Sequence, residues 1–184
     1  MICDLKIVLF GFMGVGKSVV GKILAERLGF GFVDTDEEIE KMVKSSISTI
    51  FEKYGEVKFR ILERDIVKKA SSRDRVVIAC GGGTVIDPTN VNMLKRGSIM
   101  VLLTAEPEVV LERIIKDSNI RPLLSVSDRL KQIKNLMSSR LNKYLEPADM
   151  VIDTSNKTPE DVARKIFERL EERNLGYCSQ ERVC

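Results

Sequence analysis

The sequence predicts a three-layer α/β domain with a parallel sheet, and three observations lead to this prediction. Nearly wholly apolar runs of about four to six residues alternate with longer stretches whose apolar residues recur at spacings of three and four. The short runs are typical of strands covered on both faces, and the longer stretches are typical of amphipathic helices. With 184 residues, 43% hydrophobic and 31% charged, the chain has the composition of one globular domain.

Strands and helices are expected in regular alternation, as in a parallel sheet with helices on both faces. The predicted strands are 6–10, 31–34, 76–80, 99–103 and 150–153. The predicted helices are 18–28, 57–70, 108–115, 128–145 and 159–173. The polar stretch 117–128 fits neither period, so we expect a mobile lid at about 115–127. A single domain at 1–175 would be followed by a flexible tail at 176–184.

Composition argues against several classes of function. The formal net charge is +3, from 30 Lys and Arg against 27 Asp and Glu, which argues against binding to nucleic acid. The longest apolar run, 7–16, is well below the roughly 20 residues of a membrane span, so membrane insertion is not expected. Export is not expected either, because the first residues do not form a basic segment followed by an uninterrupted apolar one. Four cysteines without a C-x-x-C spacing are typical of reduced thiols in the cytoplasm. With no histidine, chemistry must use carboxylates, lysine, arginine and backbone groups.

A phosphate-binding loop is predicted directly after the first strand. Residues 11–18 read GFMGVGKS and satisfy G-x-x-x-x-G-K-[ST] between a strand and a helix. Glycines let successive N–H groups surround a triphosphate at the positive end of that helix. Lys17 would neutralise the β and γ phosphates, and Ser18 would offer a hydroxyl to Mg²⁺. This context disfavours the alternative of a simple glycine-rich turn.

Two acidic residues close the second predicted strand. Asp34 and Asp36 are two residues apart, a spacing that places both carboxylates on one side of a strand, here toward the ligand crevice. One carboxylate could help hold hydrated Mg²⁺, and the other could accept a hydroxyl proton from an acceptor. An alternative role for Asp36 stays open, as the N-cap of a helix that begins at Glu37.

Three arginines and three glycines are further candidates for ligand binding. Guanidinium groups bind carboxylates and phosphates bidentately, which suits Arg60, Arg121 and Arg140, although an arginine taken individually is more often a solvated surface charge. Glu63 follows Arg60 by three residues and can brace it on one helical face. The glycines at 81–83 permit close backbone approach to a ligand, or form a flexible strand exit.

Taken together, these motifs resemble the shikimate kinase family over about residues 5–172. The matching segments, in the family's order, are the loop at 11–18, Asp34-Thr35-Asp36, Phe59-Arg60 with Glu63, Gly81-Gly82-Gly83, Arg121-Pro122-Leu123-Leu124, and Arg140 with Tyr144. The resemblance implies a P-loop kinase fold with a five-stranded parallel sheet in the order 2-3-1-4-5, a substrate-binding helical region at about 35–62, and a closing lid. It implies a Mg²⁺-dependent monomer that transfers the γ-phosphoryl of ATP to the 3-hydroxyl of shikimate, yielding shikimate 3-phosphate and ADP on the route to chorismate and the aromatic amino acids.

The resemblance also implies roles for the matched residues. The catalytic residues would be Asp36 as general base, Lys17 and Arg121. Mg²⁺ would be held by Ser18 and Asp34. ATP would be bound by Gly14, Val15, Gly16, Lys17, Ser18, Val19, Arg113, which would stack on adenine, and Arg121. Shikimate would be bound by Asp36, Phe51, Phe59, Arg60, Glu63, Gly81, Gly82, Gly83 and Arg140.

The same residues bear on three other functions. A GTPase would need an N-K-x-D motif, and the near match at 156–159 has Pro159 in place of the acid. A related kinase acting on gluconate or a nucleoside monophosphate stays open, although the arginine pair and the R-P-L-L segment favour shikimate. A non-catalytic nucleotide-binding module would be expected to lack the acid pair or the glycine triplet, and both are present.

Overall fold

The computed structural model describes residues 5–116 and 129–180, with side chains described as far as Arg173. The strands are β1 (Lys6–Gly11), β2 (Gly31–Asp34), β3 (Val76–Ala79), β4 (Ser98–Thr104) and β5 (Met150–Asp153). The helices are α1 (Lys17–Leu28), α2 (Thr35–Val43), α3 (Ile47–Ser71), α4 (Pro88–Lys95), α5 (Pro107–Lys116), α6 (Arg129–Leu145) and α7 (Pro159–Gln180), with a short 3₁₀ turn, η1 (Thr84–Ile86).

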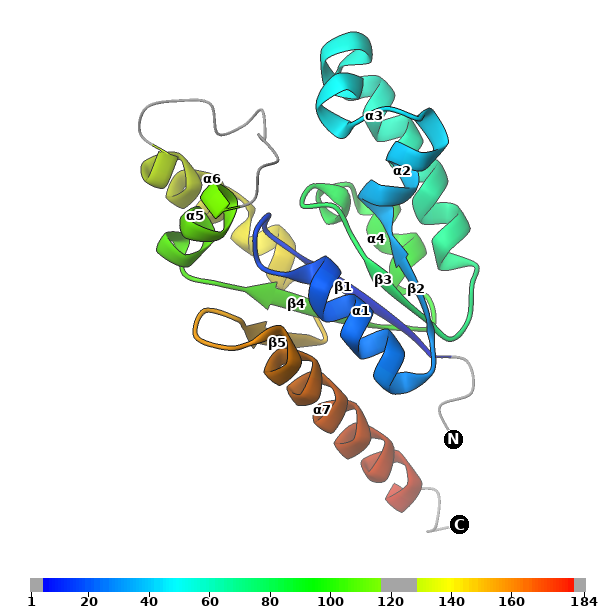
Figure 1. The fold of residues 1–184 in the computed structure, drawn as a ribbon. Helices are drawn as coiled ribbons and strands as arrows, with labels where there is room; N and C mark the ends of the chain where they lie inside the picture. The colour runs from blue at the N-terminus through cyan, green and yellow to red at the C-terminus, as the bar shows by residue number, and fades with distance from the viewer. Residues whose placement is uncertain (1–4, 117–128, 181–184) are drawn as a thin grey trace.

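The five strands form one parallel sheet in the order β2-β3-β1-β4-β5. β1 is central, because Lys6 is in register with Val76 of β3 on one side and with Ser98 of β4 on the other. Helices α1 and α7 lie in front of the sheet and α4 behind it in Figure 1. The predicted fold class and strand order are therefore confirmed, and the carboxyl ends of β1, β2 and β3 lie at one edge, where a ligand crevice is expected.

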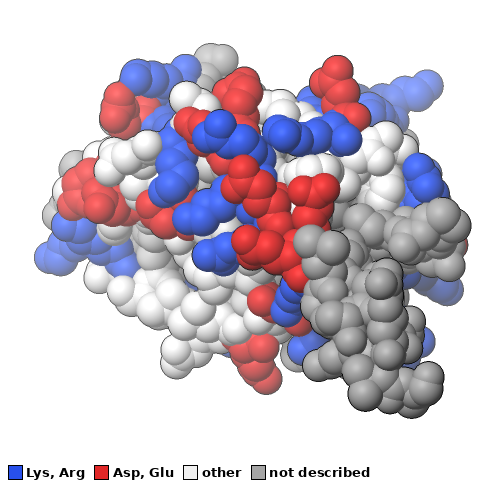
Figure 2. Space-filling view, turned by 90° about the horizontal axis from the view of Figure 1, so that it is seen from below, with Lys and Arg blue, Asp and Glu red and all other residues white. Residues whose placement is uncertain are grey.

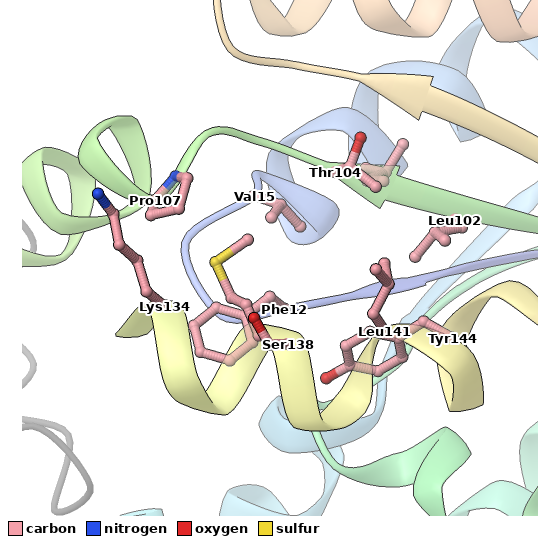
Figure 3. A pocket seen from close by; sticks show the side chains of 11 residues that line it. Phe12, Val15, Leu102, Thr104, Pro107, Lys134, Ser138, Leu141 and Tyr144 are labelled. Atoms are coloured by element: carbon pink, nitrogen blue, oxygen red, sulfur yellow. The ribbon is translucent and has the colours of Figure 1, made fainter. Parts of the chain in front are cut away.

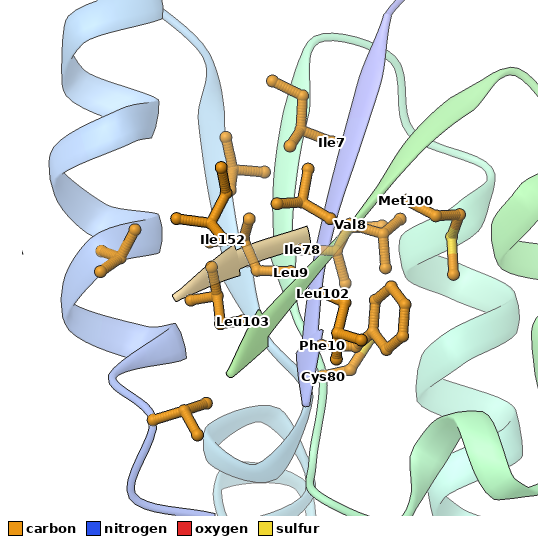
Figure 4. Close-up of a cluster of buried hydrophobic side chains, with 14 of the residues drawn as sticks. Ile7, Val8, Leu9, Phe10, Ile78, Cys80, Met100, Leu102, Leu103 and Ile152 are labelled. Atoms are coloured by element: carbon orange, nitrogen blue, oxygen red, sulfur yellow. The ribbon is translucent and has the colours of Figure 1, made fainter. Parts of the chain in front are cut away.

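The core is built on both faces of the central strands. Every residue of β1 and β3 is buried, which explains why, after Lys6 at the start of β1, their sequences are apolar without alternation. In Figure 4, Leu9 and Leu103 point toward α1, whereas Phe10 and Met100 point to the opposite side of the sheet. This double packing holds the sheet edge, and the loops that leave it, in fixed positions.

A smaller core supports the helical region beside the sheet. It consists of Ile39 from α2 and Ile50, Phe59 and Ile66 from α3, all buried. α3 is interrupted at Gly55, whose φ of 72° and ψ of 173° are not helical. The predicted helix at 57–70 matches the part after this break, whereas the earlier part of α3, like α4, was absent from the predicted helices.

The last helix extends beyond its predicted end at residue 173. α7 continues to Gln180 and so enters the segment 176–184, whose flexibility stays a prediction. Gly176 has an unfavourable helix propensity, but a single glycine does not stop a helix. The expected lid lies outside the described residues apart from its first two positions, which end α5, and Arg121 lies outside them too.

The surface mixes both signs of charge. Lys and Arg side chains are interspersed with Asp and Glu side chains over the face shown in Figure 2. Among the described residues, no helix has both the length and the apolar character that crossing a membrane requires.

Candidate active site

The phosphate loop connects the end of β1 to the start of α1, as predicted. Gly14 and Gly16 have φ values of 75° and 93°, a region that L side chains rarely adopt. Gly16 is the N-cap of α1 and has no side chain with which to cap it, so the first N–H groups of the helix face the loop. Lys17 folds back over the loop, and its Nζ donates to the carbonyl oxygens of Gly11 at 3.1 Å and Phe12 at 2.8 Å.

Asp34 links the phosphate loop to α2. Its Oδ2 accepts a hydrogen bond from the Ser18 hydroxyl at 2.5 Å, and its Oδ1 accepts from the backbone N–H groups of Asp36 and Glu37 at 3.0 and 3.2 Å. Asp34 is therefore the N-cap of a helix that begins at Thr35. The alternative role of Asp36 as N-cap is wrong, because the acid that ends the strand also caps the helix.

Two cavities meet at Asp36. The first, about 310 Å³, contains the predicted phosphate loop, and we call it the nucleotide pocket; it is lined by Met13, Gly14, Gly16, Lys17, Ser18, Val19, Asp34, Asp36, Cys80, Gly82 and Arg113. The second, about 240 Å³, contains the arginines predicted to bind the acceptor, and we call it the acceptor pocket; it is lined by Met13, Asp36, Ile47, Phe51, Glu56, Phe59, Arg60, Glu63, Gly81, Gly82, Gly83 and Arg140. Because Asp36 lines both, its carboxylate is at the boundary between a phosphate-binding loop and a second ligand space.

The acceptor pocket contains a braced arginine, as predicted from the sequence. Arg60 Nη1 donates to Glu63 Oε2 at 2.8 Å, and Glu63 is 1% exposed. The other carboxylate oxygen of Glu63 accepts from the buried hydroxyl of Thr84 at 2.7 Å. Burial by itself lowers the pKa of Arg60, but Glu63, and after it Glu56, raise this pKa above its ordinary value. Arg60 is therefore a permanent cation.

The second arginine of this pocket comes from α6. Arg140 Nη1 lies 3.4 Å from the Gly82 carbonyl oxygen, which also accepts from the Tyr144 hydroxyl at 2.5 Å. Burial raises the pKa of Tyr144, with a smaller opposing effect of Arg140, so the phenol stays protonated and can donate. These contacts fasten the glycine segment to α6 and bring Arg140 to the same pocket as Arg60.

The glycine triplet provides room for these charged groups. A Cβ atom added to Gly81 would lie 2.5 Å from Asp36 Oδ1, and one added to Gly83 would lie 2.7 Å from Arg60 Nη1. The Gly81 N–H donates to the Thr35 hydroxyl at 2.8 Å. The segment is thus hydrogen-bonded and closely packed against the site, which disfavours its interpretation as a simple flexible strand exit.

One wall of the acceptor pocket is apolar. The rings of Phe51 and Phe59 have their centroids 4.6 Å apart, and the guanidinium carbon of Arg60 lies 5.2 Å from the Phe59 centroid. Ile47 and Met13 extend the wall. A ligand for this pocket therefore combines an apolar face with anionic and hydroxyl groups.

Arg113 lies against the phosphate loop. Its Nη2 donates to the Thr154 carbonyl oxygen at 2.7 Å, and its Nη1 donates to the Thr154 hydroxyl at 3.0 Å and lies 3.4 Å from the Gly14 carbonyl oxygen. The Thr154 hydroxyl in turn donates to the Val15 carbonyl oxygen at 3.2 Å. Arg113 thus forms part of the rim of the nucleotide pocket, and adenine stacking stays a prediction.

Several pocket residues were missed from the sequence. Met13 occupies a variable position of the loop motif, and Ile47 belongs to no motif that would mark it. Glu56 lies four residues before Arg60, a helical spacing that could have indicated its ion pair. Cys80 lines the nucleotide pocket, and burial, together with Glu63, raises the pKa of its thiol, which therefore stays protonated.

A third cavity, about 370 Å³, lies between the phosphate loop, β4 and α6 (Figure 3). Its lining is mainly apolar and includes Phe12, Val15, Leu102 and Met137. Lys134 at its rim pairs with Glu108 at 2.7 Å. Its lining includes no acidic residue that could accept a proton, so this cavity does not provide the chemistry of the other two.

The Thr84 hydroxyl is expected to stabilise the fold through Glu63. Thr84→Val leaves a buried carboxylate oxygen without its donor, which should lower the free energy of unfolding by about 1–3 kcal/mol. Thr84→Ser keeps the donor and should lose clearly less. Urea unfolding of both variants is the measurement, and a Thr84→Val variant as stable as the wild type would contradict the role assigned to this hydrogen bond.

Comparisons with known proteins agree with this geometry. The family model described as shikimate kinase matches residues 13–171. The shikimate kinase of Thermodesulfovibrio yellowstonii is 45% identical over 93% of this chain and 98% of its own. That of Caldanaerobacter subterraneus subsp. tengcongensis is 48% identical over 88% and 94%, respectively.

Solved structures agree as well. Shikimate kinase from Acinetobacter baumannii, in complex with shikimate, has a TM-score of 0.88 and 39% identity over 92% of this chain and 94% of its own. A gluconokinase from Sinorhizobium meliloti has a TM-score of 0.56 at 20% identity over 96% of this chain and 98% of its own, a likeness of fold alone. With the family model spanning most of the chain and relatives above 40% identity, the chain belongs to the shikimate kinase family.

Proposed function

We propose that the chain is an ATP-dependent kinase that transfers the γ-phosphoryl group to the 3-hydroxyl of shikimate, giving shikimate 3-phosphate and ADP. The observation that carries this proposal is the position of Asp36, which lines both the nucleotide pocket and an acceptor pocket with two arginines. The relative from A. baumannii is described in complex with shikimate, which supports the choice of acceptor.

The acceptor pocket suits the chemistry of shikimate. Arg60 and Arg140 supply guanidinium groups for its carboxylate, and the Phe51 and Phe59 wall suits the apolar face of its ring. Glu63 is the positioning residue for Arg60, because its buried carboxylate fixes one edge of the guanidinium. The glycine segment offers backbone groups at the same wall without side chains in the way.

The proposed reaction uses Asp36 as general base. Its carboxylate accepts the proton of the acceptor hydroxyl as the oxygen attacks the γ-phosphorus and the bond to the bridging oxygen of ADP breaks. Lys17 and the loop N–H groups stabilise negative charge on the transferred phosphoryl group. Arg121 is predicted to contact the transferred phosphoryl group. It lies outside the described residues, so this role stays a prediction.

Mg²⁺ is the proposed cofactor. Ser18 and Asp34 would hold it, and they fit, because their oxygens are adjacent at the phosphate loop and Mg²⁺ commonly takes one or two protein ligands beside phosphate and water. Among the described residues, no group of three or more acidic or cysteine side chains forms a metal cage of its own. When bound, the ion neutralises charge on the β and γ phosphates.

The cellular setting belongs to the same proposal. We propose a cytoplasmic monomer that uses ATP and shikimate as substrates and binds neither nucleic acid nor membranes. Positive and negative side chains are interspersed on the face seen in Figure 2, which supports the expectation that the chain does not bind nucleic acid.

A coupled assay of ADP release tests the activity. Purified protein with ATP and Mg²⁺ is given shikimate, gluconate, a nucleoside monophosphate, or no acceptor. We expect ADP release that requires shikimate. Release at the same rate without an acceptor, or a preference for gluconate, would overturn the proposal.

Asp36→Asn tests the general base. The amide cannot accept the proton, so kcat should fall by a factor on the order of 10² or more, while nucleotide affinity stays near that of the wild type. Rates with shikimate and calorimetry with ADP measure the two quantities. Near-normal turnover would remove Asp36 from this role.

Arg60→Ala tests the carboxylate clamp. Removing one partner of a charged hydrogen-bonded pair should raise the KM for shikimate about tenfold or more, with little change for ATP. Arg64→Ala is the matched control, because Arg64 is on the same helix, pairs with Asp87 at 2.8 Å and does not line the acceptor pocket. Unchanged shikimate affinity in Arg60→Ala would contradict the clamp.

A further inference from the structure

The guanidinium of Arg60 is held by two glutamates on different edges. Glu63 Oε2 accepts a hydrogen bond from Nη1 at 2.8 Å. Glu56 Oε1 accepts from both Nε at 3.2 Å and Nη2 at 3.0 Å. The edge formed by Nε and Nη2 is one that a carboxylate uses for a bidentate pair with arginine. In this structure, a carboxylate of the chain itself therefore occupies a carboxylate-binding edge of Arg60.

The two glutamates differ in how firmly they are held. Glu63 is 1% exposed and also accepts from the Thr84 hydroxyl, so moving it would leave buried polar groups without partners. The side chain of Glu56 is 66% exposed, and its pair with Arg60 has the i, i+4 spacing of a surface ion pair. Exposed pairs of this kind contribute little to stability. Glu56 can leave Arg60 easily, and Glu63 cannot.

The charges of the acceptor pocket favour such a departure. Among the residues described there, Asp36, Glu56 and Glu63 face Arg60 and Arg140, three acids against two cations. An acceptor carboxylate would make four negative charges against two. If Glu56 moves out of the pocket as the acceptor enters, the pocket again holds three negative and two positive charges. One carboxylate is then exchanged for another.

The helix dipole also favours an acidic side chain at position 56, independently of Arg60. Glu56 directly follows Gly55, where α3 is broken by a φ of 72° and a ψ of 173°. Glu56 is thus in the first turn of the helical segment that carries Arg60 and Glu63. An acidic side chain is stabilised at a helix N-terminus even when it is solvated, because the helix dipole is positive there.

We propose that Glu56 sets the affinity for the acceptor by competing with the acceptor carboxylate for Arg60. In the free enzyme it occupies the Nε and Nη2 edge, and the acceptor carboxylate displaces it. Glu56 thereby lowers the affinity for an acceptor that carries a carboxylate, whereas a neutral ring alcohol leaves the pair in place and does not meet this competition. This inference rests on the proposed function, since the competing ligand is the shikimate carboxylate.

Removal of the competing carboxylate should strengthen binding. In Glu56→Gln and Glu56→Ala we expect the Kd and KM for shikimate to fall about two- to fivefold, the range for loss of an exposed ion pair. Shikimate methyl ester, which lacks the carboxylate charge, should gain nothing from either substitution. Calorimetry measures Kd and the coupled assay measures KM, with thermal unfolding as a check that the variants fold.

Glu52→Gln is the matched control, because it removes the same charge from an exposed position of α3 that does not line the acceptor pocket. It should leave the Kd for shikimate unchanged. Weaker or unchanged shikimate binding in both Glu56 variants would overturn the inference, with weaker binding assigning Glu56 to the positioning of Arg60. Failure of the proposed function is distinguishable, because the wild type would then neither bind shikimate nor release ADP in response to it.

Discussion

Three hydrogen bonds converge on the carboxylate of Asp34, and the arrangement of the candidate site depends on them. One oxygen takes the Ser18 hydroxyl, and the other caps α2 through the N–H groups of Asp36 and Glu37. The same residue thereby ends β2, starts the next helix and ties that helix to the phosphate loop. Because Asp36 is in the first turn of the capped helix, its carboxylate is directed to the boundary of the two pockets. The cap thereby helps to fix the position of Asp36 relative to the phosphate loop.

A second constraint concerns the charge in the acceptor pocket. An arginine binds a carboxylate best when its guanidinium is already oriented before the ligand arrives. A buried charged group that orients it needs hydrogen-bond partners for all of its polar atoms. The buried Glu63 meets this condition by dividing its two oxygens between Arg60 and Thr84. Arg140 is oriented differently, through the Gly82 carbonyl oxygen that it shares with Tyr144. The glycine segment therefore acts as a scaffold for both arginines, from the carboxyl end of β3.

Local patterns made much of this predictable from the sequence. The strands, the phosphate loop and the Arg60–Glu63 pair depend on residues close together in the chain, and the structure has them where they were expected. The start of α2 was misplaced because an aspartate that ends a strand and one that caps a helix have the same appearance in sequence. The contact of Gly81 with Asp36, and that of Thr84 with Glu63, join segments far apart in sequence, so no spacing reveals them. The role of Glu56 depends on which edge of Arg60 it occupies, which only coordinates can show.

In the proposed reaction, one carboxylate, that of Asp36, lies between the acceptor hydroxyl and the phosphoryl group to be transferred. The most direct measurement is a crystal structure of the protein with shikimate and a non-hydrolysable ATP analogue. We predict that the 3-hydroxyl oxygen lies within about 2.6–3.2 Å of the Asp36 carboxylate and on the side of the γ-phosphate, with the shikimate carboxylate bound by Arg60 and Arg140. A complex with the ring reversed, so that its carboxylate faces the phosphate loop and Asp36 contacts neither ligand, would contradict it.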